Sequence, residues 1–371
     1  MSLKQEKHIY MQITLRVKCI TSTRRPIIYP SGEIIAHDKR YQIKGNFMGI
    51  KLEDIFKIHG NPIEEDNESE DFEIFAYTQA LKYIRKELLE PTILKDANIH
   101  IQIFVVNNFE INAHSIKMDT SEYVIILKSG LVDFAMQTCG YDIDFLKEEL
   151  KLLGDKNDVM GLWIYLTMLY FSGHEFGHII NGHLEFSKDN YMTDEKSTIN
   201  IFNMKNLPSS LKSKPDIFYH LLELNADRLS VIFLSRGLLN LLIKYKQDYD
   251  KDTLESLIEL ITYNIYLTHY KFGFFDVKNE KYPTHFFRAY SILNDFPQVL
   301  NTLFKKDTHE KIQKTVDNAM YKIFEYLSDN DEDFLSEKNK KNIHNYNDNI
   351  SSLYTKEQKD FNDFLKVYSM I

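Results

Sequence analysis

Two long runs of apolar residues dominate the pattern of this chain. The first extends from Val159 to Ile180 and is apolar on nearly every side of a helical projection. A helix that is apolar all round is a buried one. The second extends from Pro215 to Tyr245. Ser213 and Asp216 flank its proline, a pattern that resembles the start of a helix. We therefore expect two buried helices at the centre of the fold.

The rest of the pattern predicts strands and shorter helices. Strict alternation over residues 9–19, and short apolar stretches, are typical of strands. The expected strands are 9–19, 98–107 and 122–128, and the expected further helices are 71–90, 144–153, 252–269, 285–295 and 308–328. The polar stretch 185–214 is interpreted as a loop. These elements predict an α+β fold, mostly helical with a small sheet.

The 371 residues can hold one large domain, or one main domain with additions. We expect a small strand-rich N-terminal region at 1–70, the main domain at 71–330, and a polar C-terminal tail with a weak helix at 331–371. The net charge of −9 disfavours nucleic acid as a partner.

Cysteine usage and apolar run lengths bear on the compartment. Only Cys19 and Cys139 occur, so cysteine alone cannot build a zinc site, and dependence on disulfides is not expected. No uncharged apolar stretch reaches the length of a membrane span, and the first residues lack the pattern of a signal peptide. We therefore expect a soluble, cytoplasmic protein with no membrane span.

The first buried run contains an H-E-x-x-H motif, His174-Glu175-Phe176-Gly177-His178. Two histidines four residues apart share a helix face, so both imidazoles can reach one metal ion. Glu175 projects beside that face, where it can take a proton from a metal-bound water. The motif predicts a Zn²⁺ hydrolase. The alternative is a buried helix whose histidines merely hydrogen-bond their neighbours.

The second buried run offers a third ligand. Glu223 and Asp227 are four residues apart on one face of an otherwise apolar helix, where carboxylates need partners. Glu223 would bind the ion, and Asp227 would accept the outer N–H of a ligand histidine. An ion pair between Asp227 and the adjacent Arg228 is the simpler alternative.

Other histidines compete with Glu223. His183 follows the motif closely, but it is more simply a residue that contacts a ligand or lies on the surface. His220 lies three residues before Glu223 and shares its face. His114 falls in an expected strand or loop and is interpreted as polar surface.

These motifs resemble those of a known family. HEFGH followed by Glu223-Leu224-Asn225-Ala226-Asp227 is similar to the minimal gluzincin peptidases, which combine H-E-x-x-H with a downstream E-x-x-x-D. The family includes membrane zinc proteases of the heat-shock and prenyl-protein-processing types, and soluble relatives such as the phage-exclusion peptidase Lit. The resemblance implies a zincin-like catalytic domain with a small sheet edging the active-site cleft.

Two further segments extend the resemblance. Glu110 to Ala113, followed by Tyr123 to Leu131, is similar to the family's segment in which a strand edges the active site and a helix follows. It implies that Asn112 and Ala113 contact the substrate. Tyr282 to Arg288 resembles the family's His-Pro…Arg stretch, with Tyr282 in place of the histidine and His285 three residues later. One of these two would stabilise the oxyanion.

The expected function is hydrolysis of a protein or peptide substrate. Zinc held by His174, His178 and Glu223 would activate a water for which Glu175 is the general base. An extended substrate could pair with the strand 122–128 or with the segment at Asn112–Ala113. The alternatives are a catalytically inactive zincin-fold binding module, a structural zinc site with a fourth protein ligand such as His183 or His220, and a non-peptidase hydrolase.

Overall fold

The computed structural model describes most of the main domain. It covers residues 50–65, 72–89, 94, 98–150, 153, 156–185, 215–244, 251–273, 283–304, 309–331, 334 and 336. Within this part the protein is mostly helical with one small sheet, which confirms the α+β class. The expected strand at 9–19, the loop 186–214 and the tail helix lie outside the described residues.

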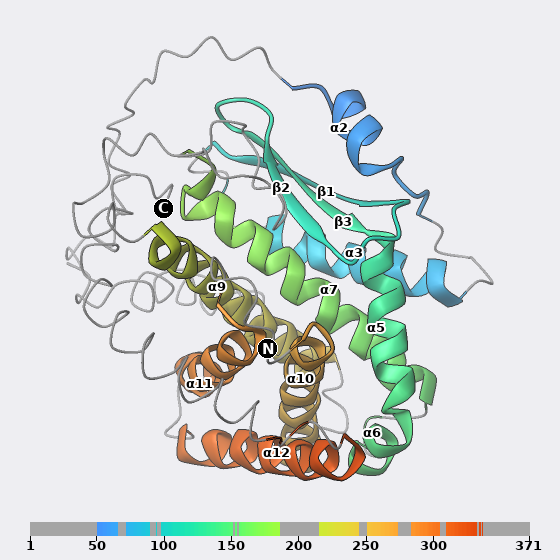
Figure 1. Ribbon diagram of the computed structural model, residues 1–371, viewed down its shortest axis with the longest axis vertical. Coiled ribbons are helices and arrows are strands. Elements are labelled where there is room, and N and C mark those ends of the chain that lie inside the picture. Colours follow the sequence, from blue (N-terminus) through green and yellow to red (C-terminus); the bar gives the residue numbers. More distant parts are fainter. Residues whose placement is uncertain are drawn as a thin grey trace.

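The two apolar runs form the central pair of helices (Figure 1). Among the described residues after 70, the longer helices are α3 (Phe72–Leu89), α5 (Ser129–Tyr141), α6 (Ile143–Glu149), α7 (Lys156–Ile180), α9 (Pro215–Lys244), α10 (Lys251–Lys271), α11 (His285–Phe304) and α12 (His309–Asn330). Helix α7 packs against α9, α3, α5 and the sheet, and its side chains from Trp163 to Tyr170 are buried. Apolar burial on all sides is what its sequence predicts.

Most expected helices are confirmed, and one is longer than expected. Helix α11 continues past Pro297 to Phe304, although proline removes a helix hydrogen bond. Phe296, Val299 and Leu300 on either side of this proline are buried in the core. Their burial favours the continued helix over an end at residue 295.

The sheet has three strands in the order β1-β3-β2. They are β1 (His100–Val106), β2 (Ala113–Lys117) and β3 (Glu122–Lys128). Strand β3 pairs in parallel with β1 and antiparallel with β2, so it is central. The expectation that residues 122–128 could pair with a substrate is therefore wrong, because both edges of β3 are taken. Among the described strands, β2 is at an edge.

Helices cover both faces of the sheet. On one face lie α7 and α3, and on the other lies α2 (Leu52–His59), whose Ile55 packs with Val106, Ile116 and Ile126 (Figure 1). Helix α2 lies in the region expected to be strand-rich, of which residues 50–65 are described. Strands before residue 50, and the boundaries of the three regions, stay predictions.

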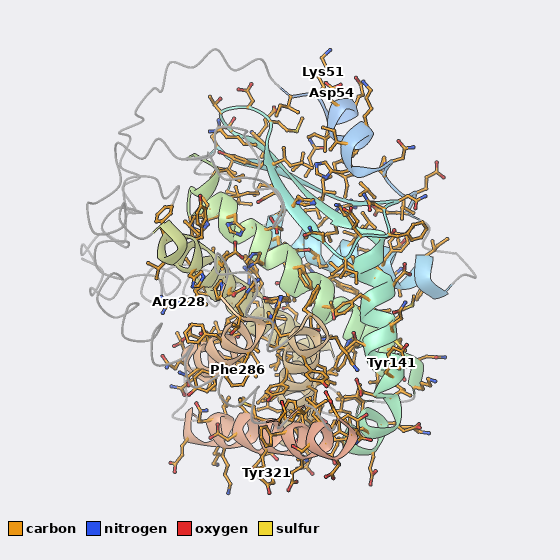
Figure 2. All side chains as sticks on the ribbon, in the orientation of Figure 1. Lys51, Asp54, Tyr141, Arg228, Phe286 and Tyr321 are labelled. Carbon is orange, nitrogen blue, oxygen red and sulfur yellow. The ribbon has the colours of Figure 1, made fainter. Side chains whose placement is uncertain are left out.

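Side chains fill the spaces between the helices, whereas Tyr141 on α5 and Tyr321 on α12 are 77% and 63% exposed (Figure 2). Where α7 and α9 cross, however, the contact is made by small residues. A Cβ on Gly177 would come 2.8 Å from the Cα of Ala226, and a Cβ on Gly173 would come 3.1 Å from the Cα of Ser230. These glycines let the two backbones approach closely. As a result, the helix face that carries Glu223 and Asp227 meets the H-E-x-x-H motif.

We predict that Gly177→Ala destabilises the protein by about 1–3 kcal/mol, because the new methyl group meets backbone atoms that cannot move aside cheaply. Gly161→Ala is the matched control in the same helix. A Cβ there meets nothing within 4 Å, so the better helix propensity of alanine should stabilise by up to about 1 kcal/mol. Urea unfolding of the metal-free proteins measures both changes. Equal free energies of unfolding for the two variants would contradict the close crossing.

Candidate metal centre

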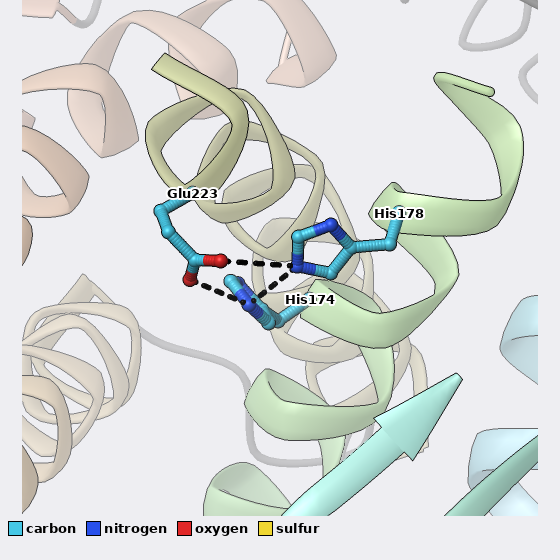
Figure 3. Close-up of side chains that lie close together, drawn as sticks. All are labelled: His174, His178 and Glu223. Carbon is cyan, nitrogen blue, oxygen red and sulfur yellow. Dashed lines mark hydrogen bonds and ion pairs between the residues drawn. The ribbon is translucent and has the colours of Figure 1, made fainter. Parts of the chain in front are cut away.

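His174 and His178 on α7 point toward Glu223 on α9 (Figure 3). The two Nε2 atoms are 3.0 Å apart. The carboxylate oxygens of Glu223 lie 3.3 Å from the Nε2 of His174 and 3.6 Å from the Nε2 of His178. All three side chains are buried. The predicted proximity of these three residues is confirmed.

The three side chains could hold one metal ion. Each offers one ligand atom, and these atoms all lie within 4.8 Å of one another. Two imidazole nitrogens and a carboxylate oxygen are a donor set that zinc accepts. In the described part of the chain no further His, Cys, Asp or Glu joins this group. Three protein ligands with a position left open are typical of catalytic rather than structural zinc.

Asp227 lies behind His174. Its Oδ1 is 2.9 Å from the Nδ1 of His174 and also accepts a hydrogen bond of 2.9 Å from the hydroxyl of Tyr170. The guanidinium of Arg288 donates to both carboxylate oxygens, each at 2.8 Å. Arg228 pairs instead with Asp295 of α11. Asp227 therefore does not form the simple ion pair with Arg228. It contacts His174 instead and orients this candidate metal ligand.

The sequence does not predict that Arg288 and Tyr170 belong to the site, yet both hydrogen-bond to Asp227. Arg288 lies one turn inside α11, and one of its Nη atoms is also 3.6 Å from a Glu223 oxygen. The one signal for Arg288 was its place at the end of the segment Tyr282 to Arg288. Nothing in the sequence marks Tyr170 among its apolar neighbours on α7.

The charges of the site are strongly coupled. Burial lowers the pKa of His174, but hydrogen bonds to Asp227 and Glu223 outweigh this effect and raise it to about 9. Burial raises the pKa of Glu223, but the neighbouring His174 outweighs it and lowers it to about 2. Burial also holds the pKa of His178 well below its usual range. At pH 7 the metal-free site therefore holds one protonated histidine beside an ionised Glu223.

Glu175 lies beside the two histidines on α7 and faces the edge strand. It is 7% exposed. Burial raises its pKa, and the neighbouring His174 and Ser115 of β2 offset part of that rise. A carboxylate made more basic by burial is better suited to accept a proton near neutral pH.

The remaining histidines take different places. His183 is buried and lies 2.8 Å from the Nδ1 of His178, on the side of that ring facing away from Glu223. It is therefore a neighbour of a candidate ligand and not a rival third ligand. His220 is buried on α9, outside the group of three. The interpretation of His114 as polar surface is wrong, since it is buried on β2 against the ring of His59.

The residues expected to contact the substrate lie around β2, and His285, a candidate for stabilising the oxyanion, lies at the start of α11. Asn112 precedes β2, and its side-chain oxygen accepts a hydrogen bond from the amide of Ala113. The Nδ1 of His285 is 3.1 Å from the Nδ1 of His269, whose ring packs against Tyr170. His285 thus reaches the cluster through His269 and Tyr170. Tyr282 lies outside the described residues.

Comparison with protein-family models, curated proteins and solved structures finds no match to this chain. The interpretation of the site therefore depends on its own residues. Of the helices described, none has the length and apolar character needed to cross a membrane.

We predict that Glu223→Ala abolishes stoichiometric zinc binding, because two histidines alone leave the ion with too few protein ligands. Asp227→Ala should weaken zinc affinity by about 10–100-fold, as the loss of a residue that orients a ligand does in other sites. Both are measured by competition with a chelator, with Asp295→Ala as a control that removes a carboxylate from the neighbouring ion pair. Full zinc binding by folded Glu223→Ala would refute the ligand assignment.

Zinc binding should also release a proton. His174 is protonated below pH about 9 in the metal-free site, whereas His178 is already neutral and Glu223 already ionised. The loss of the His174 proton should therefore raise zinc affinity by at least about tenfold for each pH unit from 7 to 9. Calorimetry in buffers of different ionisation enthalpy at pH 7.5 should give about one proton released per zinc from His174, in addition to any proton lost by a zinc-bound water. Release of no proton would contradict this charge assignment.

Proposed function

We propose that this protein is a zinc-dependent metallopeptidase with a zincin-like, gluzincin-type catalytic domain. One observation carries the proposal. Helices α7 and α9 bring two histidines and Glu223 together at one buried point, with Glu175 beside them and one position free of described protein ligands. A catalytic zinc site needs these components.

A zinc ion bound by His174, His178 and Glu223 would lower the pKa of a water and polarise the scissile carbonyl. The residues of the chain hold this arrangement in place. Asp227 fixes the ring of His174, and Arg288 offsets the charge of Asp227. Tyr170 supplies a further hydrogen bond to the same carboxylate. The ligand side chains are thus oriented before an ion arrives.

Glu175 would act as the general base and then as the acid. It would accept a proton from the attacking water at a carboxylate oxygen and deliver that proton to the leaving nitrogen. Its raised pKa suits both steps, because the group must gain and lose a proton near neutral pH. His285 and Tyr282 stay our candidates for the oxyanion donor, and the contact of His285 with His269 favours an indirect role for His285.

The proposed substrate is an extended segment of a protein or peptide. Strand β2 is the edge strand nearest the motif, with Asn112 and Ala113 at its start and Ser115 facing Glu175. A substrate pairing with β2 would pass directly over the site. All five residues of β2 are buried, so strand addition requires this edge to be uncovered first.

An inactive binding module is the second candidate function. It would use the same fold and the same ion without moving a proton. The retained Glu175, which the ligand set does not need, favours the enzyme. A non-peptidase hydrolase would use the same residues, and only the identity of the substrate separates it from a peptidase.

Glu175→Gln separates the enzyme from the binding module. Glutamine keeps the size and can hydrogen-bond a water, but it cannot accept a proton. The variant should fold, bind zinc with unchanged stoichiometry and cleave at least about 100-fold more slowly than the wild type. Mass spectrometry of a proteome-derived peptide library, incubated with each protein, measures the cleavage.

The matched control is Glu185→Gln, a nearby glutamate at the end of the short helix after the motif. It should cleave at the wild-type rate. If Glu175→Gln cleaves as fast as the wild type, Glu175 is not the base. If wild-type protein loaded with zinc cleaves no peptide or protein, the binding module becomes the better interpretation.

A further inference from the structure

The ring of His178 has an outer partner that the proposed mechanism does not use. The Nδ1 of His178 is 2.8 Å from the Nδ1 of His183, and the Nε2 of His183 is 3.2 Å from the side-chain oxygen of Asn225. All three side chains are buried. They form a line that leads from the candidate metal position to helix α9.

Local backbone geometry brings His183 to this place. Helix α7 ends at Ile180, and Gly182 follows with φ 72°, a left-handed conformation that favours glycine. The chain turns back there, with the amide of Gly182 bonded to the carbonyl of Ile179. His183 thus lies under the last turn of α7. Asn225, two residues after Glu223, meets it from α9.

The hydrogen-bonding chemistry of Asn225 and His183 determines which nitrogen carries the proton in the rings of His183 and His178. The side-chain oxygen of Asn225 is an acceptor only, so the Nε2 of His183 must donate to it. His183 has no anionic partner among these contacts, and a buried imidazolium without one is costly, so His183 is neutral. Its Nδ1 is therefore an acceptor. The Nδ1 of His178 must then donate, so the Nε2 of His178 carries a lone pair that faces His174 and Glu223.

We propose that His183 and Asn225 are positioning residues that fix His178 in the Nδ1-protonated tautomer and aim its Nε2 at the metal. This inference rests on the proposed metal centre. The two candidate histidine ligands are then anchored differently. His174 is held by an anionic carboxylate that Arg288 compensates, and His178 is held by a neutral chain. The neutral chain orients its ring without adding charge to the site.

The first experiment needs no metal. Long-range ¹H–¹⁵N spectra of the metal-free full-length protein, labelled with ¹⁵N-histidine, distinguish the two neutral tautomers of each ring. We expect His178 to carry its proton on Nδ1 and His183 to carry its proton on Nε2. The signals of His183 are assigned by their absence from the spectra of the His183 variants. The opposite tautomers, or a charged His183 at pH 7, would overturn the proposal.

The second experiment measures zinc affinity and the visible spectrum of bound Co²⁺. His183→Phe keeps a ring but removes the acceptor, so the proton on Nδ1 of His178 is buried without a partner. Zinc affinity should fall by about 10–100-fold, and the Co²⁺ bands should shift as the ring of His178 reorients. His183→Gln can accept the same hydrogen bond and should recover most of the affinity. His100→Gln, which removes an exposed histidine on β1, is the control.

The outcomes separate this inference from the proposed function. If folded His183→Phe binds zinc as the wild type does, with an unchanged Co²⁺ spectrum, His183 does not position His178. If His183→Gln is as weak as His183→Phe, a direct ligand or packing role replaces the hydrogen bond. Should His183→Phe not fold, Asn225→Leu must still weaken zinc binding, and an unchanged zinc affinity of folded Asn225→Leu would overturn the proposal. The expected tautomers and zinc affinities, found together with no peptidase activity, would refute the proposed peptidase function. They would leave the positioning role of His183 and Asn225 standing.

Discussion

The close crossing of α7 and α9 is the constraint on which the rest of the site depends. No metal ligand set can form from these helices unless their backbones come near enough for a carboxylate on one to reach two imidazoles on the other. Gly173 and Gly177, opposite Ser230 and Ala226, provide that separation. Because Gly177 lies inside the H-E-x-x-H motif, the same five residues supply the candidate chemistry and the packing surface that positions it. A larger residue at 177 would affect both at once.

Close approach creates a second requirement, which is the compensation of buried charge. Glu223 and Asp227 are ionised in the interior, and an isolated buried carboxylate would instead take up a proton. Arg288 supplies a permanent cation to Asp227, and His174 holds a proton between the two carboxylates while no ion is bound. A divalent cation would replace that proton. The site is therefore arranged so that the charge of the metal is balanced by groups already in position.

The parts of the site set by helical periodicity could be predicted from the sequence. Residues four apart share a helix face, and this rule alone placed His174 with His178 and Glu223 with Asp227. Arg288 and Asn225 could not be placed, because their contacts depend on how separate helices pack. The burial of His114 could not be predicted for a related reason. Strand β2 is covered on both faces, so it lacks the alternation by which a half-buried strand is recognised. Helix α11 extends beyond its predicted end at residue 295 because burial around Pro297 outweighs the helix-breaking effect of proline.

The contact between Arg288 and Asp227 also makes the site depend on a late part of the chain. The two residues are 61 positions apart, and the arginine comes later. When α7 and α9 have left the ribosome, the chain already holds the complete set of candidate ligands, but the carboxylate behind them has no guanidinium. That carboxylate is compensated only once α11 has emerged and docked, because domains fold as units while the chain grows from its N-terminal end. A chain that ends before α11 would therefore lack the cation that balances Asp227.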